Sequence, residues 1–116
     1  MPQSIQAIAE AFSRHRFSEA LPHFSEGVTW SLLGEDTLTG KDAVVAACDS
    51  TTAELRDVTT VFSHFRTIVG EDCVVIDSIG RYTDAGGSTS VVASCDIFDF
   101  ADGLVTAIRS YNIELE

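Results

Sequence analysis

The sequence predicts an α+β fold, in which three N-terminal helices pack in the concave side of a strongly curved, mostly antiparallel sheet. Apolar residues recur every three or four positions up to about residue 56 and every second position beyond it. Short turns separate the later apolar stretches, so neighbouring strands should run antiparallel. The 116 residues, 45% of them apolar, suffice for one core, and we expect a single domain over residues 1–116.

The first helix is predicted from apolar residues that share one helical face. Ile5, Ile8 and Phe12 have this spacing and indicate an amphipathic helix of about three turns. Ser18 can cap a short second helix that runs through Phe24. A strand should follow at residues 28–32, where apolar and polar residues alternate.

The third helix is predicted to begin at Thr39, which Asp42 follows three residues later, and to end near Arg56. The preceding segment GEDTLTG, residues 34–40, is the loop that we suspect of acting as a lid. Four strands should follow at residues 57–69, 73–83, 89–100 and 104–115, separated by the turn sequences GED, DAGG and ADG. Strands about twice the usual length of five or six residues must twist and curl.

Charge and composition exclude several classes of partner. The net charge of −11 comes from 18 acidic and 7 basic residues, and it opposes binding to nucleic acid or to an anionic membrane. The same field favours neutral or cationic ligands over anionic ones. The N-terminus lacks the apolar stretch of a signal peptide, and no window approaches the roughly 18 apolar residues of a membrane span. We therefore expect a cytoplasmic protein.

No cofactor and no metal ion are expected. Cys48, Cys73 and Cys95 show neither disulfide nor metal-ligand spacing, so they should be three reduced thiols. His15 and His23 lie in or beside the predicted helices without the paired spacing of a zinc site. We expect both histidines to be solvated or to cap a helix.

Three stretches carry a family resemblance. FSEGVTWSLLGEDTLTGKDAV, the long strands and CDIFDFADGLVTAIRSY resemble, in order and spacing, the SnoaL-like branch of the nuclear transport factor two superfamily. This superfamily includes ketosteroid isomerases, polyketide cyclases and limonene-epoxide hydrolases. The resemblance covers almost the whole chain and implies a cone-shaped α+β fold. It leaves the reaction open, because this fold hosts several chemistries.

The residue sets of two known reactions are incomplete. Matching to ketosteroid isomerases puts the tyrosine, the aspartate base and the oxyanion-binding aspartate at Ile8, Leu32 and Asp96, so only the third is present. Limonene-epoxide hydrolases use an Arg-x-Asp pair, whereas Arg81 and Asp84 have one residue too many between them. A second hydrolase aspartate matches Ser110. Neither mechanism is therefore expected.

Strand alternation places one set of side chains on the concave side. If Asp96 faces inward, Phe98 and Ser94 do so too, and family matching adds Leu104 and Ile108 from the last strand. A bulge would reverse these faces beyond it. The residues expected to bind a ligand are Trp30, Leu32, Tyr82, Ser94, Phe98, Ile108, Ser110 and Asn112.

This lining is apolar with a few polar groups, as in most small-molecule pockets. Burial would raise the pKa of Asp96 and allow it to act as a general acid, a hydrogen-bond donor or a weak base; alternatively, it is a structural carboxylate. We expect a pocket for a small apolar or weakly polar molecule, and an isomerase, cyclase or dehydratase that uses Asp96 without a cofactor. The alternatives are a noncatalytic ligand-binding module and a protein-interaction scaffold.

The convex face of the sheet should mix charged and apolar side chains, as subunit interfaces often do. The residues expected there are His64, Arg66, Val75, Asp77, Ile79, Arg81, Ile97, Arg109 and Tyr111. Relatives within the superfamily commonly dimerise across this sheet. We therefore expect a homodimer through the outer face.

Overall fold

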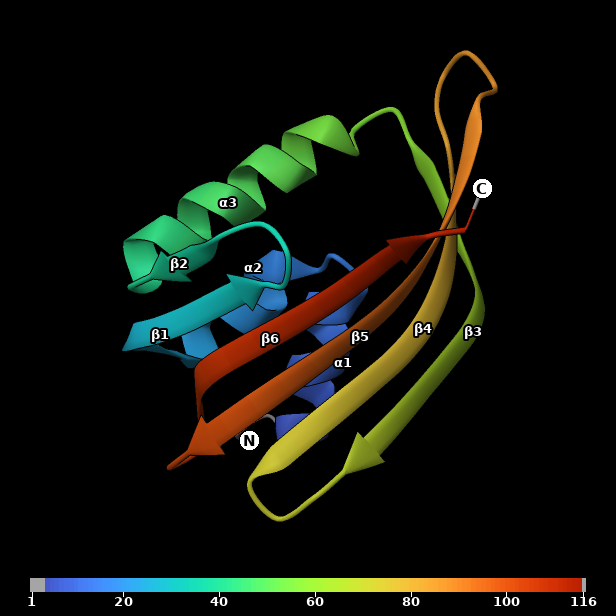
Figure 1. Cartoon of the computed structure of the whole chain (residues 1–116). Helices are drawn as coiled ribbons and strands as arrows, with labels where there is room; N and C mark the ends of the chain where they lie inside the picture. Colours follow the sequence, from blue (N-terminus) through green and yellow to red (C-terminus); the bar gives the residue numbers. More distant parts are fainter. Residues whose placement is uncertain (1–3, 116) are drawn as a thin grey trace.

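The computed structural model describes residues 4–115 and has the predicted α+β architecture. Six strands form one curved sheet in the order β2-β1-β6-β5-β4-β3, and the helices lie on its concave side (Figure 1). Neighbouring strands are antiparallel except β1 and β6, which are parallel. The sheet therefore curves around the helices as the length of its strands predicts.

The helical elements are α1 (Ile5–Ser13), α2 (Phe17–Ala20), the 3-10 turn η1 (Leu21–His23) and α3 (Lys41–Glu54). The side chain of Ser4 caps α1 by accepting a hydrogen bond from the backbone N–H of Ala7 at 3.1 Å. The cap predicted at Ser18 is wrong, because α2 begins one residue earlier and Ser18 lies inside it. Pro22 then lies in η1, which ends at His23 rather than at Phe24.

The start of α3 also differs from the prediction. Thr39 is the last residue of a short strand, β2 (Thr37–Thr39), and Gly40 precedes the helix with a φ of 92°. β2 pairs with β1 (Phe24–Leu32), which begins four residues before the predicted strand. The segment suspected of being a lid is thus partly tied into the sheet by backbone pairing.

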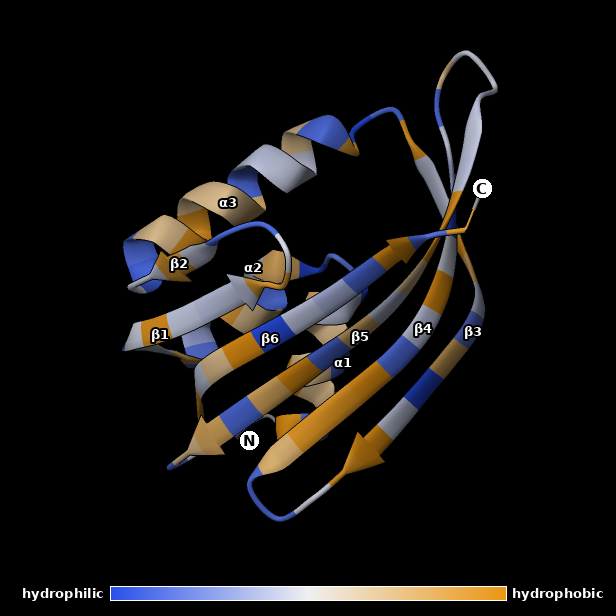
Figure 2. Ribbon diagram, viewed as in Figure 1, coloured by the Kyte–Doolittle hydropathy of each residue, from blue (hydrophilic) through white to orange (hydrophobic). Residues whose placement is uncertain are grey.

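The long strands agree closely with the predicted ranges: β3 (Thr59–Val69), β4 (Cys73–Thr83), β5 (Thr89–Ala101) and β6 (Leu104–Glu114). Polar and apolar residues alternate along β5 and β6 (Figure 2). The predicted inward orientation of Leu104 is wrong. The β5–β6 register shifts between Asp99 and Phe100, so that Phe100 pairs with Val105. This bulge buries Val105 completely and leaves Leu104 38% exposed.

The core lies between the sheet and the helices. α1 packs against β3, β4 and β5, and α3 packs against β1 and β2. The ring of Phe12 lies at its centre, with centroid distances of 5.2 Å to Phe17, 5.6 Å to Phe24, 5.0 Å to Trp30 and 5.6 Å to Phe98. The aromatic cluster joins α1 to both halves of the sheet.

No helix of the described residues covers the convex face of the sheet. Ile68, Tyr111 and Ile113 are exposed on the described surface, and His64 pairs with Asp77 across β3 and β4 at 3.0 Å. The homodimer expected through this face stays a prediction. Within residues 4–115, every helix is too short or too polar to cross a membrane.

Candidate functional site

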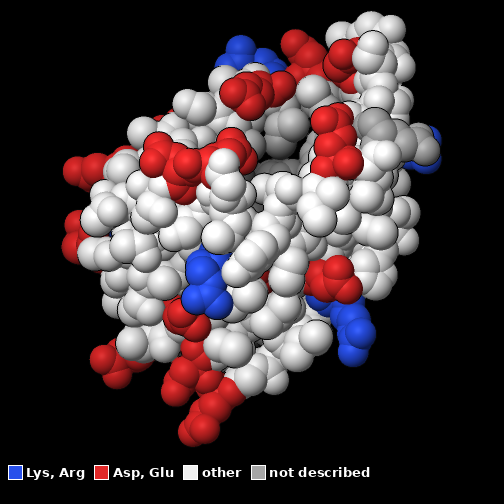
Figure 3. All heavy atoms as spheres, viewed as in Figure 1, with Lys and Arg blue, Asp and Glu red and all other residues white. Residues whose placement is uncertain are grey.

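A cavity of about 330 Å³ lies between the sheet and the helices. Its wall is built from α1, the turn after it, α2, α3 and strands β1, β3, β4, β5 and β6. The lining includes Thr51 of α3, Leu55 directly after this helix, and Asn112 of β6. Figure 3 shows a hollow in this region of the surface, with acidic residues beside it. The volume lies at the lower end of the range for small-molecule sites.

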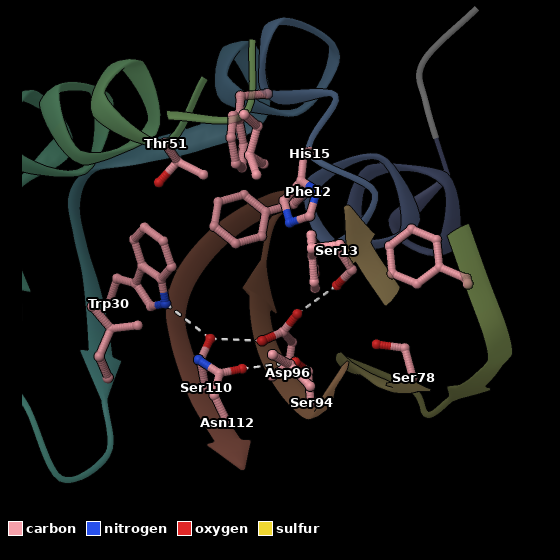
Figure 4. Close-up of a pocket in the computed structure, with 16 residues that line it drawn as sticks. Phe12, Ser13, His15, Trp30, Thr51, Ser78, Ser94, Asp96, Ser110 and Asn112 are labelled. Carbon is pink, nitrogen blue, oxygen red and sulfur yellow. Dashed lines mark hydrogen bonds between the residues drawn. The ribbon is translucent and has the colours of Figure 1, made fainter. Parts of the chain in front are cut away.

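Asp96, near the middle of β5, is the carboxylate in the cavity wall. The hydroxyl of Ser13 donates to its Oδ2 at 2.7 Å, and the hydroxyl of Ser110 donates to its Oδ1 at 2.6 Å (Figure 4). Trp30 Nε1 donates to Ser110 Oγ at 2.9 Å. Because the indole occupies an acceptor position of Ser110, the serine proton is directed to the carboxylate. Three elements thus fix the position of Asp96.

Burial raises the pKa of Asp96 above its ordinary value, because desolvation disfavours the charged form. The hydrogen bonds from Ser110 and Ser13 and the charge of His15 act in the opposite direction. The raised pKa shows that desolvation outweighs these stabilising contacts. Asp96 can therefore hold a proton at a higher pH than an exposed aspartate.

His15 is a second titratable acid–base group in the cavity wall. It is half-buried and follows the C-cap residue Arg14, so it is neither the freely solvated residue nor the helix cap that the sequence predicts. It lies just after α1 with a φ of 64°, which turns the chain toward the cavity. Its ring centroid is 5.9 Å from Phe17, 6.0 Å from Tyr82 and 6.3 Å from Phe62. Burial lowers the pKa of His15, and the charge of Asp96 partly opposes that change. Burial thus brings the pKa values of Asp96 and His15 closer together than they are in water.

Two further polar features lie on the sheet side of the cavity. Ser94 donates a hydrogen bond to Asn112 Oδ1 at 2.8 Å, so neighbouring strands present a polar pair. Tyr82 lies over Gly80, where an added Cβ would meet the ring at 3.1 Å. Glycine therefore makes room for the tyrosine against the sheet. Burial, followed by the charge of Asp96, raises the pKa of Tyr82.

The structure brings most of the predicted site residues together. The cavity lining includes Asp96, Trp30, Leu32, Tyr82, Ser94, Ser110 and Asn112. Phe98 and Ile108 do not line it, because both are 0% exposed and belong to the core. Alternation along a strand predicts which face of the sheet a side chain occupies but not whether it reaches the cavity surface. This explains why Phe98 and Ile108 were wrongly expected to line the cavity.

Sequence reasoning missed Ser13 and His15. The spacing of four residues from Ile5 to Ala9 continues to Ser13, so an extended helical pattern would have placed this serine on the inner face. The orientation of His15 depends on the left-handed backbone after α1. No sequence pattern around this histidine indicates that conformation.

The described residues contain no cluster of three or more histidine, cysteine, aspartate or glutamate side chains arranged to hold a metal ion. The three cysteines are free thiols, and none lines the cavity. Burial raises the pKa of the Cys48 thiol to about 12, so this thiol stays protonated. The titratable side chains that line the cavity are therefore those of Asp96, His15 and Tyr82.

The fold and the cavity define an α+β cone with a carboxylate in its inner wall. The family model described as the SnoaL-like domain matches residues 5–108, and the chain belongs to this family. None of the curated proteins matches it.

Solved structures share the fold. An NTF2-like protein of unknown function from Cytophaga hutchinsonii is 29% identical, with a TM-score of 0.81 over 92% of this chain and 94% of that one. A candidate polyketide cyclase from Xanthomonas campestris is 20% identical, with a TM-score of 0.73 over 92% and 85%. An LEH-like epoxide hydrolase from M. tuberculosis is 14% identical, with a TM-score of 0.71 over 93% and 81%. The latter two similarities concern the fold alone.

Proposed function

We propose that this protein is a cofactor-independent enzyme of the isomerase, cyclase or dehydratase kind, acting on a small, largely apolar molecule. The observation that carries the proposal is a desolvated carboxylate, Asp96, in the wall of a cavity that is otherwise mostly apolar. Such a carboxylate can exchange a proton with a bound molecule that water reaches poorly. The reaction moves protons and requires no electron carrier.

His15 supplies the second group that proton transfer needs. Burial raises the pKa of Asp96 and lowers that of His15, so the free-energy cost of moving a proton between them is smaller than in water. One group can remove a proton from the substrate while the other returns a proton at a second atom. This division of roles serves an isomerisation or an elimination equally well.

The remaining wall can orient the substrate. The rings of Phe12 and Trp30 provide apolar surface beside Asp96, whereas Ser94 and Asn112 offer a polar pair on neighbouring strands. An apolar molecule with one polar substituent could satisfy both parts of the wall. Its reacting carbon would then lie near the carboxylate.

A noncatalytic binding module is the second candidate. It is favoured by the hydrogen bonds of Asp96, because both carboxylate oxygens already accept a serine hydroxyl. A structural carboxylate would be held in the same way. A protein-interaction scaffold receives less support, because the cone contains an open cavity instead of being packed solidly.

Ligand binding and proton exchange in deuterium oxide separate these candidates. A panel of small apolar ketones, alcohols and enols would be screened through the fluorescence of Trp30, the single tryptophan of the chain. Molecules that bind should then incorporate deuterium at carbon or form a product, as followed by NMR. The cavity-filling variant Val92→Trp should lose both binding and exchange; its binding would be followed by calorimetric titration, because the added tryptophan contributes its own fluorescence.

Binding without exchange or conversion, across the pH range in which Asp96 and His15 titrate, would contradict the enzymatic proposal. That outcome would support the binding module. Equal exchange by wild type and Val92→Trp would contradict the use of this cavity.

A further inference from the structure

We propose that the ligand of this cavity is an organic cation, in which apolar groups surround a protonated or quaternary nitrogen. The inference rests on the proposed function in taking this cavity as the binding site, and it adds the chemical class of the ligand. Three features carry it: an unbalanced carboxylate, aromatic walls and an acidic surface beside the cavity.

The first feature is the absence of a fixed positive charge beside Asp96. Its hydrogen-bond donors, Ser13 and Ser110, are neutral, and Trp30, the next donor in the chain, is neutral too. Among the described residues that line the cavity, none is lysine or arginine. An ionised carboxylate in such surroundings lacks a counter-charge, and a bound cation would supply one.

Arg14 does not fill this role. Its guanidinium carbon lies 3.8 Å from the ring centroid of Phe65 and 5.8 Å from that of Phe62, and Arg14 is not part of the cavity lining. The same contacts show a cation lying over aromatic rings at the edge of this site. His15 is the remaining basic group, and burial lowers its pKa and favours its neutral form.

The second feature is the number of aromatic rings in the wall. Phe12, Phe17, Trp30, Phe62 and Tyr82 line the cavity from α1, α2, β1, β3 and β4. The face of an aromatic ring attracts a cation, and this attraction strengthens where water is excluded. Rings alone suit any apolar ligand. Rings combined with an unbalanced carboxylate favour an ammonium group surrounded by methyl or methylene groups.

The third feature is the charge of the surrounding surface. Glu54, Asp84 and Glu114 are exposed and lie one or two positions from the lining residues Leu55, Tyr82 and Asn112. By the same measure the exposed Arg56 lies beside Leu55, Arg81 beside Tyr82, and Arg14 and Arg16 beside His15, so the excess of acidic charge belongs to the chain as a whole. Acidic groups border the surface hollow in Figure 3, and the whole chain carries a net charge of −11. This field draws cations toward the cavity and repels anions.

A proton competes with the cation for Asp96. The titratable groups that face this carboxylate from the cavity wall are His15 and Tyr82. As pH falls, Asp96 takes up a proton and His15 becomes positively charged, and both changes oppose cation binding. As pH rises through the pKa values of Asp96 and His15, the cation should bind more tightly. At pH values where these two groups are partly protonated, binding of the cation should release protons.

Choline and 3,3-dimethylbutan-1-ol test the inference, because they have the same shape and differ in the charge of the central atom. Calorimetric titration of the wild-type protein should show that choline binds about tenfold more tightly than the alcohol. Asp96→Asn should reduce this preference several-fold, to what the aromatic rings and the surface charge supply without the carboxylate, and leave alcohol binding nearly unchanged. Asp99→Asn, an exposed charge change on the same strand, should preserve the preference.

Three results would overturn the cation inference: no binding of choline, equal or tighter binding of the alcohol, or a choline preference that is undiminished in Asp96→Asn. The last would assign the preference to the rings and the surface charge instead of the cavity carboxylate. Tight binding of the alcohol alone would leave the proposed function standing, because the cavity would still bind a small apolar molecule.

Discussion

Replacing Asp96 by asparagine should lower kcat by about 10²- to 10⁴-fold, the usual contribution of a positioned acid–base group. Asparagine keeps the shape of aspartate but cannot exchange a proton in this range. The dissociation constant should change by about tenfold at most, because the cavity and its aromatic wall remain. Rates under substrate saturation and calorimetric titration would measure the two effects separately.

The matched control is Asp99→Asn, three residues further along β5. Asp99 is exposed and does not line the cavity, so its replacement removes a charge from the same strand without changing the site. Its kcat should equal that of the wild type. A kcat for Asp96→Asn within a few-fold of the control would contradict proton transfer by Asp96.

Replacing Phe98 by alanine should lower the free energy of unfolding by about 3–5 kcal/mol, the usual cost of removing a fully buried phenylalanine ring. Phe98 is 0% exposed, and its ring centroid lies 5.6 Å from that of Phe12. The cavity left behind would adjoin the aromatic cluster that joins α1 to the sheet. Urea denaturation followed by circular dichroism would measure the loss.

Ile97→Ala provides the comparison, because Ile97 is the next residue on β5 and points to the opposite face. Ile97 is half-buried in the described structure, so its truncation should destabilise the protein clearly less than Phe98→Ala. Equal losses would contradict a core confined to the concave side of the sheet.

The sequence was sufficient to predict the fold because its hydrophobic periods are clear: helical spacing marks the helices before residue 56, and alternation marks the strand at residues 28–32 and the long strands beyond residue 56. These periods determine which elements form and which faces they bury. β2 was missed because its three residues, Thr37–Thr39, are too few to show a period. The pairing of β2 with β1 is a tertiary contact that no local pattern encodes.

Predictions of individual faces failed where the backbone departs from regular geometry. The bulge between β5 and β6 leaves Leu104, which was expected to face inward, partly exposed and buries Val105 instead. The left-handed conformation of His15 turns its chain segment toward the cavity. Alternation and helical spacing assume regular backbone, so they could not reveal either feature.

Alternation sufficed to place Asp96 on the concave face because the register of β5 is regular around it, whereas its hydrogen-bond partners required the structure. Ser110 lies where the family resemblance places a hydrolase aspartate, and here it accepts from Trp30 and donates to Asp96. Leu32 lies where an isomerase base is expected, and it lines the cavity with apolar surface. The cavity wall therefore contains one carboxylate, that of Asp96, which accepts hydrogen bonds from the hydroxyl groups of Ser13 and Ser110.

The titration of the Asp96 carboxyl carbon by ¹³C NMR tests most directly whether this cavity holds a desolvated acid that can exchange protons. The resonance would be assigned by its loss in Asp96→Asn. We expect a pKa above the ordinary aspartate value, because burial disfavours the charge, and a further increase in Ser13→Ala and Ser110→Ala, which each remove a donor to the carboxylate. A pKa at or below the ordinary value would contradict the proposed chemistry.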